Sequence, residues 1–167
     1  MKVFIIEAQS ADGFIARDHS APSTAWTSKE DKEFFREHTK RAGVMIMGAT
    51  TYKTIGRPMK DRVTIVYSRS ETYEGVEMTQ DDPKTLIDKL SARGFTEVAI
   101  CGGSSIYSMF LEAGVVDTIY LTVEPVLFGS GVSPFKDSTD TKLELVSESK
   151  TESGTLFLEY KVLSTIS

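Results

Sequence analysis

The stretch 98–123, VAICGGSSIYSMFLEAGVVDTIYLTV, predicts a strand, a helix and a second strand in direct succession. An apolar run ends at Cys101, the pair Gly102-Gly103 interrupts it, and a helical segment follows from Ser104 to Glu112. A β-branched run then extends from Val116 to Val123. This order is typical of two parallel strands joined by a right-handed crossover. The stretch therefore predicts an α/β fold with a largely parallel sheet.

The rest of the chain continues this alternation. Strands are expected at 3–8, 44–47, 62–67 and, weakly, near Val76. Helices are expected from the N-cap Ser28 to about Lys40, from Thr50 or Thr51 towards Ile55, and from Pro83 to Ala92. Polar loops cover 10–27 and 125–140, and a hairpin through Glu152-Ser153-Gly154 joins strands at 142–150 and 155–163. We expect one domain, 1–167, with a mixed, mostly parallel sheet, helices on both faces and a C-terminal antiparallel hairpin.

Composition and charge exclude several classes of function. Nineteen basic and twenty-four acidic residues argue against a nucleic-acid surface, although a local pocket can still be positive. Cys101 is the only cysteine, and His19 and His38, both expected in solvent, have no partners at metal-ligand spacing, so no metal site is predicted. The chain offers neither an apolar run of the roughly 20 residues that span a bilayer nor a signal-peptide pattern, so we expect a cytoplasmic protein without a membrane.

Ligands of parallel sheets bind outside the carboxyl ends of the strands, and three predicted ends carry suitable residues. Gly102-Gly103 precedes a helix whose free N–H groups suit a phosphate, and Gly48 precedes hydroxyls at the start of another helix. Tyr67-Ser68-Arg69 ends a third strand, where Arg69 can pair with a phosphate. Alone, the Gly-Gly pattern is equally typical of a tight turn, and the other two patterns are more typical of a helix cap and of a solvated arginine. Together they favour an extended ligand with several phosphates, such as a dinucleotide.

An acidic residue on the first predicted helix is the candidate for proton chemistry. Asp31 and Phe35 are four residues apart and share one helix face, with Phe34 beside it. A carboxyl group held beside aromatic rings is partly desolvated, which raises its pKa and suits proton delivery. A carboxylate can also hold an amino-pyrimidine ring through paired N–H donors. The alternative is an acidic first turn favoured by the helix dipole alone.

Four motifs, taken jointly, resemble the dihydrofolate reductase superfamily, which includes the pyrimidine reductases of riboflavin synthesis. The resemblance covers about residues 3 to 135, in order and at family spacing. The motifs are Trp26-x4-Asp31-x2-Phe34-Phe35-x3-Thr39, Ile46-Met47-Gly48-x2-Thr51-Tyr52-x2-Ile55-Gly56-Arg57-Pro58, Gly102-Gly103-x2-Ile106-Tyr107 and Tyr120-Leu121-Thr122.

The resemblance implies hydride transfer from NADPH to a ring C=N bond of a pterin or folate-type substrate. It suggests Asp31 as the catalytic, substrate-orienting acid, with Trp26 over the active site. The substrate-binding residues it implies are Phe35, Ile55, Arg62 and Thr122. The cofactor-binding residues it implies are Ala8, Ile15, Gly48, Thr50, Thr51, Ser68, Arg69, Gly102, Gly103, Ser104, Ser105, Ile106 and Tyr107.

Several residues depart from the dihydrofolate reductase pattern and leave alternatives open. The opening Ser10-Ala11-Asp12-Gly13-Phe14-Ile15-Ala16 looks more like that of riboflavin-pathway reductases, so a 5-amino-6-(5-phosphoribosylamino)uracil reductase is the alternative, and Arg62 suits either anionic substrate. Ala49 stands where an arginine for the 2′-phosphate is common, so NADH is not excluded. Lys32 and Glu7 replace apolar or small residues, and a non-catalytic nucleotide-binding module is the second alternative. Related riboflavin-pathway domains tend to dimerise, which makes a homodimer the expected assembly.

Overall fold

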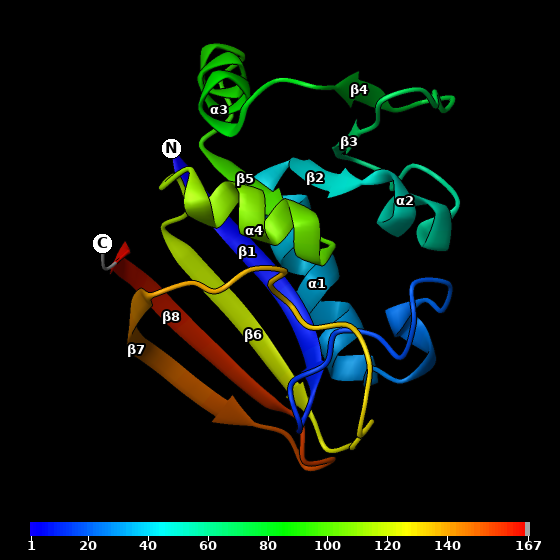
Figure 1. Ribbon diagram of the computed structural model, residues 1–167, viewed down its shortest axis with the longest axis vertical. Coiled ribbons are helices and arrows are strands. Elements are labelled where there is room, and N and C mark those ends of the chain that lie inside the picture. The colour runs from blue at the N-terminus through cyan, green and yellow to red at the C-terminus, as the bar shows by residue number, and fades with distance from the viewer. Residues whose placement is uncertain (166–167) are drawn as a thin grey trace.

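The computed structural model describes residues 1–165, and within them eight strands form one sheet flanked by four α-helices (Figure 1). The strands are β1 (Lys2–Ser10), β2 (Val44–Gly48), β3 (Val63–Tyr67), β4 (Glu77–Thr79), β5 (Glu97–Ile100), β6 (Thr118–Glu124), β7 (Thr141–Lys150) and β8 (Leu156–Thr165). The helices are α1 (Lys29–Ala42), α2 (Ala49–Ile55), α3 (Pro83–Ala92) and α4 (Ser104–Glu112), with a short 3-10 turn at Ser23–Ala25 inside the expected first loop.

The strand order across the sheet is β4-β3-β2-β5-β1-β6-β8-β7. All pairings from β4 to β6 are parallel, whereas β8 runs antiparallel to both β6 and β7. The last strand is therefore inserted between β6 and the strand that precedes it in the chain. The predicted mixed sheet with a C-terminal antiparallel hairpin is confirmed.

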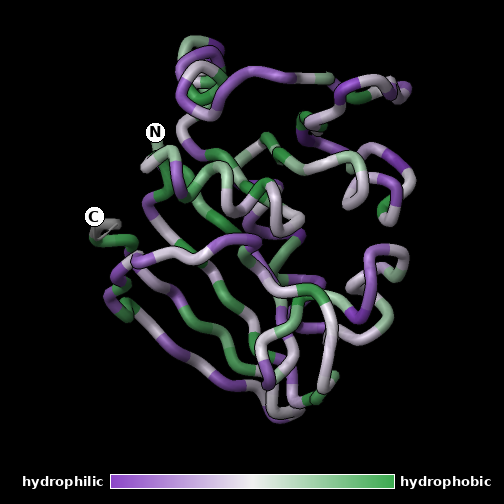
Figure 2. The backbone as a smooth tube through the Cα atoms, viewed as in Figure 1, coloured by the Kyte–Doolittle hydropathy of each residue, from purple (hydrophilic) through white to green (hydrophobic). Residues whose placement is uncertain are grey.

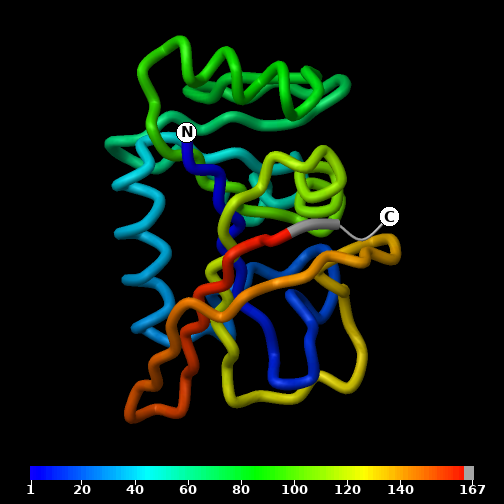
Figure 3. The backbone as a smooth tube through the Cα atoms, turned by 90° about the vertical axis from the view of Figure 1, so that its left-hand side faces the viewer, coloured from blue at the N-terminus to red at the C-terminus, as the bar shows by residue number. Residues whose placement is uncertain are grey.

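Two apolar layers cover the faces of the sheet, because successive side chains of a strand point to opposite sides. Val3 and Ile5 of β1 pack with α3 and α4, whereas Phe4 and Ile6 pack with α1 and α2. Figure 3 shows α1 to one side of β1 and α4 to the other. Hydrophobic residues follow the central strands in Figure 2, and hydrophilic ones follow the outer loops. The prediction of helices on both faces is thus confirmed.

The helix starts follow the expected capping chemistry. The Ser28 hydroxyl accepts a hydrogen bond from the Asp31 amide at 3.1 Å and caps α1. The Asp82 carboxylate accepts one from the Thr85 amide at the same distance and caps α3, with Pro83 at the first helical position. Helix α1 continues two residues beyond the predicted Lys40 and ends at Gly43 in the left-handed conformation.

One expectation about the first helix is wrong. His38 was expected to face solvent, but its ring stacks on Phe34 with centroids 3.8 Å apart and lies 4.6 Å from the ring of Tyr120. The Phe34 carbonyl contacts Nδ1 at 2.9 Å, and burial lowers the pKa of His38. The histidine belongs to the aromatic packing between α1 and the sheet. His19, by contrast, is exposed as expected.

Within residues 1–165, no helix is long and apolar enough to cross a bilayer. The same part of the chain holds no group of three or more His, Cys, Asp or Glu side chains arranged for a metal ion.

Candidate active site

The parallel strands β1, β2, β3, β5 and β6 end at one edge of the sheet, and the predicted site residues follow these ends. Beyond the paired residues of β2 and β5, the Gly48 amide donates to the Gly102 carbonyl at 2.8 Å. Two of the glycine-bearing ends expected to contact a dinucleotide therefore lie directly beside each other.

The Gly102-Gly103 turn presents bare backbone at this edge. The peptide bond between the two glycines is cis, and Gly102 has a φ of +116° that side-chain-bearing residues rarely adopt. A Cβ on Gly102 would lie 3.3 Å from the Tyr107 hydroxyl oxygen, and one on Gly103 would lie 3.4 Å from Oγ1 of Thr51. Helix α4 begins behind the turn with no side-chain cap. Gly102 itself is buried, so a ligand can approach this edge at the half-buried Gly103 and the exposed Ser105 of the helix start.

Some of the residues around the turn are exposed at its surface, and others are buried beneath it. Ser105 and, across the turn on α2, Thr50 are exposed, whereas Ser104, Ile106 and Tyr107 are buried. The Tyr107 hydroxyl donates to the Ile6 carbonyl of β1 at 2.9 Å. Ile106 and Tyr107, both predicted to bind cofactor, thus lie beneath the turn and support it.

The third strand end holds a polar pair. The Ser68 hydroxyl accepts a hydrogen bond from the Glu71 amide at 3.0 Å, which tightens the turn after β3. The side chain of Arg69 is exposed and its carbonyl faces the Gln80 amide group at 3.5 Å. Arg69 is thus accessible to an anion in solution.

Asp31 lies half-buried in the first turn of α1, on the side of the sheet where Thr122 of β6 points. Burial raises the pKa of this carboxyl group, and the charge of Glu124 raises it further. A hydrogen bond with Thr122 and the charge of Lys32 act in the opposite direction. The raised pKa agrees with the expectation from the neighbouring aromatic residues.

Sequence reasoning missed Glu124, which holds the start of α1 in place. This glutamate ends β6, is 3% exposed, and accepts a hydrogen bond from the Ser28 hydroxyl at 2.9 Å. It also accepts from the hydroxyl of Thr155, just before β8, at 3.2 Å. The only available signal was an acidic residue at the end of an apolar strand. Glu124 thereby links the last hairpin to the helix that carries Asp31.

The other predicted substrate residues surround the same side of the sheet. Phe35 of α1 and Ile55 of α2 pack against the apolar cluster of that face, and Thr122 is buried. Arg62 donates through Nη1 to the Thr39 hydroxyl at 2.7 Å and through Nε to the Lys60 carbonyl at 2.9 Å. Its guanidinium is therefore held against α1.

Trp26 belongs to the loops beside this side of the sheet. Its ring meets the ring of Phe128 edge-to-face, with centroids 5.0 Å apart, and the guanidinium of Arg17 lies 4.1 Å from the same phenyl ring. The structure thus joins Trp26 to the loop that follows β6, and its place over a substrate stays a prediction.

Asp12 explains why that loop lies beside the loop after β1 (Figure 1). Its carboxylate accepts hydrogen bonds from the Ser10 hydroxyl at 2.6 Å and from the Gly129 amide at 2.7 Å. These bonds, with one from Phe128, lower the pKa of Asp12 to about 2. Ile15 also donates its amide to the Val132 carbonyl at 2.9 Å. The Ser-x-Asp-Gly opening therefore joins two loops and holds Ile15 at the edge of the site.

Glu7 is the other acidic residue that the sequence marked as unusual. It is 8% exposed, faces Leu121 of β6 in the strand register, and its Oε2 has no hydrogen-bond partner within residues 1–165. Burial raises the pKa of Glu7 to about 7. By strand alternation from Val3 and Ile5, it lies on the α4 side of the sheet, opposite to Asp31.

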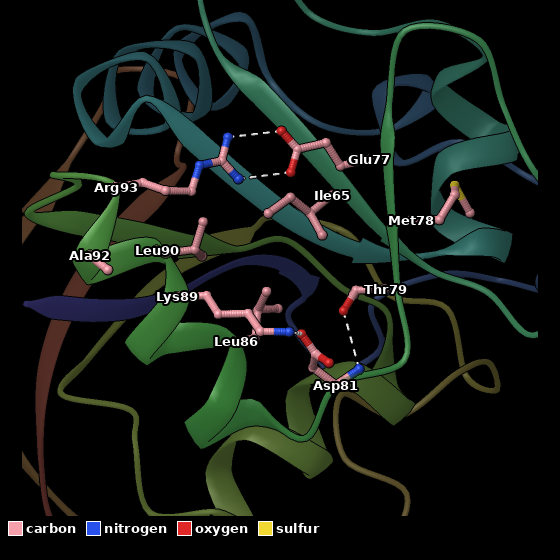
Figure 4. A pocket seen from close by; sticks show the side chains of 10 residues that line it. All are labelled: Ile65, Glu77, Met78, Thr79, Asp81, Leu86, Lys89, Leu90, Ala92 and Arg93. Carbon is pink, nitrogen blue, oxygen red and sulfur yellow. Dashed lines mark hydrogen bonds and ion pairs between the residues drawn. The ribbon is translucent and has the colours of Figure 1, made fainter.

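Two surface hollows lie elsewhere, and no predicted site residue lines them. One, of about 420 Å³, lies between β4 and α3, where Figure 4 shows the Arg93–Glu77 and Lys89–Asp81 ion pairs. The other, of about 650 Å³, is lined by residues such as Tyr52, Arg57 and Tyr73. The charged side chains of the first hollow are paired with one another, and neither hollow contains a predicted site residue. The strand ends therefore remain the candidate site.

Comparison with known proteins identifies similar chains. A family model described as dihydrofolate reductase matches residues 2–157. The dihydrofolate reductase of Haemophilus influenzae is 32% identical over 123 residues, which are 73% of this chain and 71% of the relative. A pyrimidine reductase-like protein of Corynebacterium diphtheriae superposes with a TM-score of 0.80 at 22% identity, over 98% of this chain and 92% of its own. Dihydrofolate reductase from Enterococcus faecalis, complexed with NADP(H), superposes with a TM-score of 0.73 at 24% identity, over 98% of this chain and 97% of its own.

Proposed function

Because the chain belongs to the dihydrofolate reductase family, we propose that it is an NADPH-dependent reductase of a pterin or folate-type substrate. The family supports an oxidoreductase, and the proposal adds the cofactor and the substrate class. The observation that carries it is Asp31, a half-buried carboxyl group with a raised pKa on the helix beside the strand ends.

The strand ends fit a dinucleotide phosphate. Substituting either glycine of the Gly102-Gly103 turn would fill the space beside Tyr107 and Thr51, and α4 begins there without a side-chain cap. The N-terminus of α4 and the Thr51 hydroxyl would hold the diphosphate. Exposed Arg69 would pair with a 2′-phosphate and so replace the arginine that is common at the position of Ala49. NADH remains an alternative that a direct affinity comparison decides. The reduced nicotinamide supplies the hydride.

Asp31 orients the substrate and supports its protonation. As a carboxylate it accepts N–H donors of an amino-pyrimidine ring, and its raised pKa keeps the protonated form accessible at a higher pH than usual. Glu124 and Ser28 fix the helical turn from which Asp31 projects. Phe35 and Ile55 supply apolar surface for the ring.

A riboflavin-pathway substrate, a ribosylaminopyrimidine phosphate, is the alternative favoured by the charge near Arg62. Burial lowers the pKa of Arg62 and the charge of Arg36 on α1 lowers it further, against the opposing charge of Asp61, so two cations lie close together here. Lys32 lies one helical turn before Arg36 and is exposed. Three cations in this region suit the phosphate of a ribosylaminopyrimidine better than they suit the apolar part of a folate-type substrate.

We also propose a homodimer. Leu143, Leu145 and Val146 of the edge strand β7 are 40%, 49% and 55% exposed. Apolar side chains gathered on an outer strand are typical of an interface.

The test is a fluorescence titration with NADPH followed by steady-state turnover of dihydrofolate and of the ribosylaminopyrimidine phosphate. We expect NADPH binding by wild type and by Asp31→Asn, and a loss of turnover of about 100-fold or more in the variant, the usual contribution of a positioned acid. Asp88→Asn, an exposed acid on α3, is the matched control and should retain full turnover.

The outcomes separate the candidate functions. Preferred turnover of the pyrimidine would support the alternative. Tight NADPH binding without turnover of any pterin or pyrimidine would favour a non-catalytic nucleotide-binding module. Undiminished reduction of dihydrofolate by Asp31→Asn would remove Asp31 from its role.

A further inference from the structure

Glu7 is a buried carboxyl group that the proposed chemistry does not use. Its side chain is 8% exposed and its Oε2 has no hydrogen-bond partner among the described residues. Burying a polar atom without a partner costs free energy, so an apolar residue would stabilise this strand better. A group kept under these conditions calls for a partner that arrives with a ligand.

The surroundings of Glu7 place it at the ligand edge of the sheet. It is the third residue of the series Val3, Ile5 and Glu7, which points towards α4. Tyr107 of α4 crosses this part of β1, because its hydroxyl donates to the Ile6 carbonyl at 2.9 Å. Burial raises the pKa of Tyr107, and the nearby charge of Glu7 raises it further.

This pair is surrounded by the side-chain-free backbone of Gly102 and by apolar side chains. Gly102 brings no side chain to the Tyr107 hydroxyl, which lies 3.3 Å from where a Cβ would stand. Ile15, Leu121 and Phe135 pack against the same apolar cluster from the two loops and β6. Ile15 and Tyr107 are both among the cofactor-binding residues that the family resemblance implies, which places Glu7 beside the expected cofactor.

We propose that Glu7 is the counter-charge of the oxidised, cationic nicotinamide ring and gives up its proton when that ring replaces the neutral reduced one. The proposal rests on the proposed cofactor use. A carboxylate in a water-poor site attracts a cation strongly, whereas the neutral carboxylic acid suits the uncharged reduced ring. Glu7 thereby stabilises the charge that hydride donation creates.

The protons and electrons of the coupled step balance. The hydride carries two electrons from the nicotinamide to the substrate carbon, and the substrate nitrogen gains one proton as the C=N π bond is lost. The nicotinamide gains one positive charge, and Glu7 gains one negative charge by releasing one proton. The proton released by Glu7 equals the proton consumed at nitrogen, so oxidation of the bound cofactor needs no net change of charge around Glu7.

The other titratable groups near Glu7 can be separated from it. The charges of Cys101 at the end of β5 and of Asp31 on α1 also act on Tyr107 of α4. Burial raises the pKa of both Tyr107 and Cys101, far from neutrality. Asp31 is therefore the one other group of this set that a pH titration near neutrality has to control.

The experiment measures Kd for NADPH and for NADP⁺ by calorimetry between pH 5.5 and 8.5. The ratio of the two constants cancels the titration of the phosphates that both nucleotides share. We expect NADP⁺ to gain about five- to tenfold over NADPH as pH rises through the Glu7 transition, since one coupled proton changes an affinity by up to tenfold per pH unit. In buffers of different ionisation enthalpy, NADP⁺ should release up to one proton more than NADPH.

Two variants and one spectroscopic measurement decide the outcome. The pH dependence of the ratio should vanish in Glu7→Gln and persist in Asp31→Asn. Carboxyl ¹³C shifts of labelled glutamate in wild type should report the same transition without any substitution, moved to lower pH by NADP⁺. Tight binding of both nucleotides with a ratio independent of pH, or an unchanged dependence in Glu7→Gln, would overturn the inference alone. Failure of both nucleotides to bind would overturn the proposed function with it.

Discussion

Glu7 links the stability of the free protein to pH. Its folded-state pKa of about 7 lies above the ordinary value of 4.5, so the folded protein holds a proton that the unfolded chain releases between these values. Raising the pH through this window therefore lowers the free energy of unfolding. The full effect above pH 7 is about 3 kcal/mol, because one pKa unit corresponds to roughly 1.4 kcal/mol.

Glu7→Gln tests this linkage, because glutamine stays neutral at every pH. We expect the free energy of unfolding in urea to fall by about 3 kcal/mol more in wild type than in Glu7→Gln between pH 4.5 and pH 8.5. Other carboxyl groups titrate equally in both proteins and cancel in this difference. Parallel pH profiles for the two proteins would mean that Glu7 is ionised and solvated in the folded state.

At the residue scale, the sequence identifies which residues carry functional groups better than it identifies the side chains that surround them in the fold. The acid Asp31 and the glycines at 102 and 103 carry local signals, namely helix spacing and a strand-to-helix break. The burial of His38 is not predicted because Tyr120, and Phe157 which stacks on Phe34, come from segments distant in the sequence. Glu124 was missed for the same reason, since its partner Ser28 is 96 residues away.

At the element scale, two N-caps of equal geometry serve different purposes. Ser28 and Asp82 each accept an amide hydrogen bond at 3.1 Å from the third residue of their helix. Only Ser28 also reaches Glu124, and only α1 carries Asp31. The cap of α1 therefore positions a functional group, whereas the cap of α3 stabilises a helix remote from the predicted site residues.

Ser28→Ala and Asp82→Ala separate these purposes. Loss of either cap should lower the free energy of unfolding by about 1 kcal/mol, the usual value for an N-cap. Ser28→Ala should in addition reduce kcat for the proposed substrate, because the first turn of α1 loses its bond to Glu124, while Asp82→Ala should not. Urea unfolding and steady-state kinetics on both variants provide the check, and equal kcat values would count against a positioning role for Ser28.

The elements themselves were largely readable from the sequence. Capping residues, Gly-Gly and β-branched runs predicted all four helices and all eight strands within a few residues, because these signals are local. The order of the last two strands was not readable. Both β7 and β8 alternate in the same way, and which of them pairs with β6 depends on contacts such as Leu121 with Leu158.

At the scale of the whole molecule, the outer edge formed by β7 is the surface through which we propose that two copies associate. Leu145→Lys should convert the proposed homodimer into a monomer, because a charge replaces an apolar contact, with a change in the free energy of unfolding below about 0.5 kcal/mol for an exposed site. Sedimentation equilibrium measures the change. Leu127→Lys, at a residue that is 73% exposed in a loop, is the control and should remain dimeric. A monomeric wild type would refute this assembly.

The insertion of β8 between β6 and β7 has a consequence for the order of folding. As the chain is synthesised, β7 emerges before the one strand it pairs with, so it cannot join the growing sheet by itself. β7 can join the sheet only through β8, either as a hairpin that docks along β6 or by adding to β8 once β8 has paired with β6. Docking also brings Thr155 to Glu124, which restrains the start of α1 through Ser28. The bond from Thr155 that completes the support of the α1 start therefore forms only in this last step, after most of the sheet already exists.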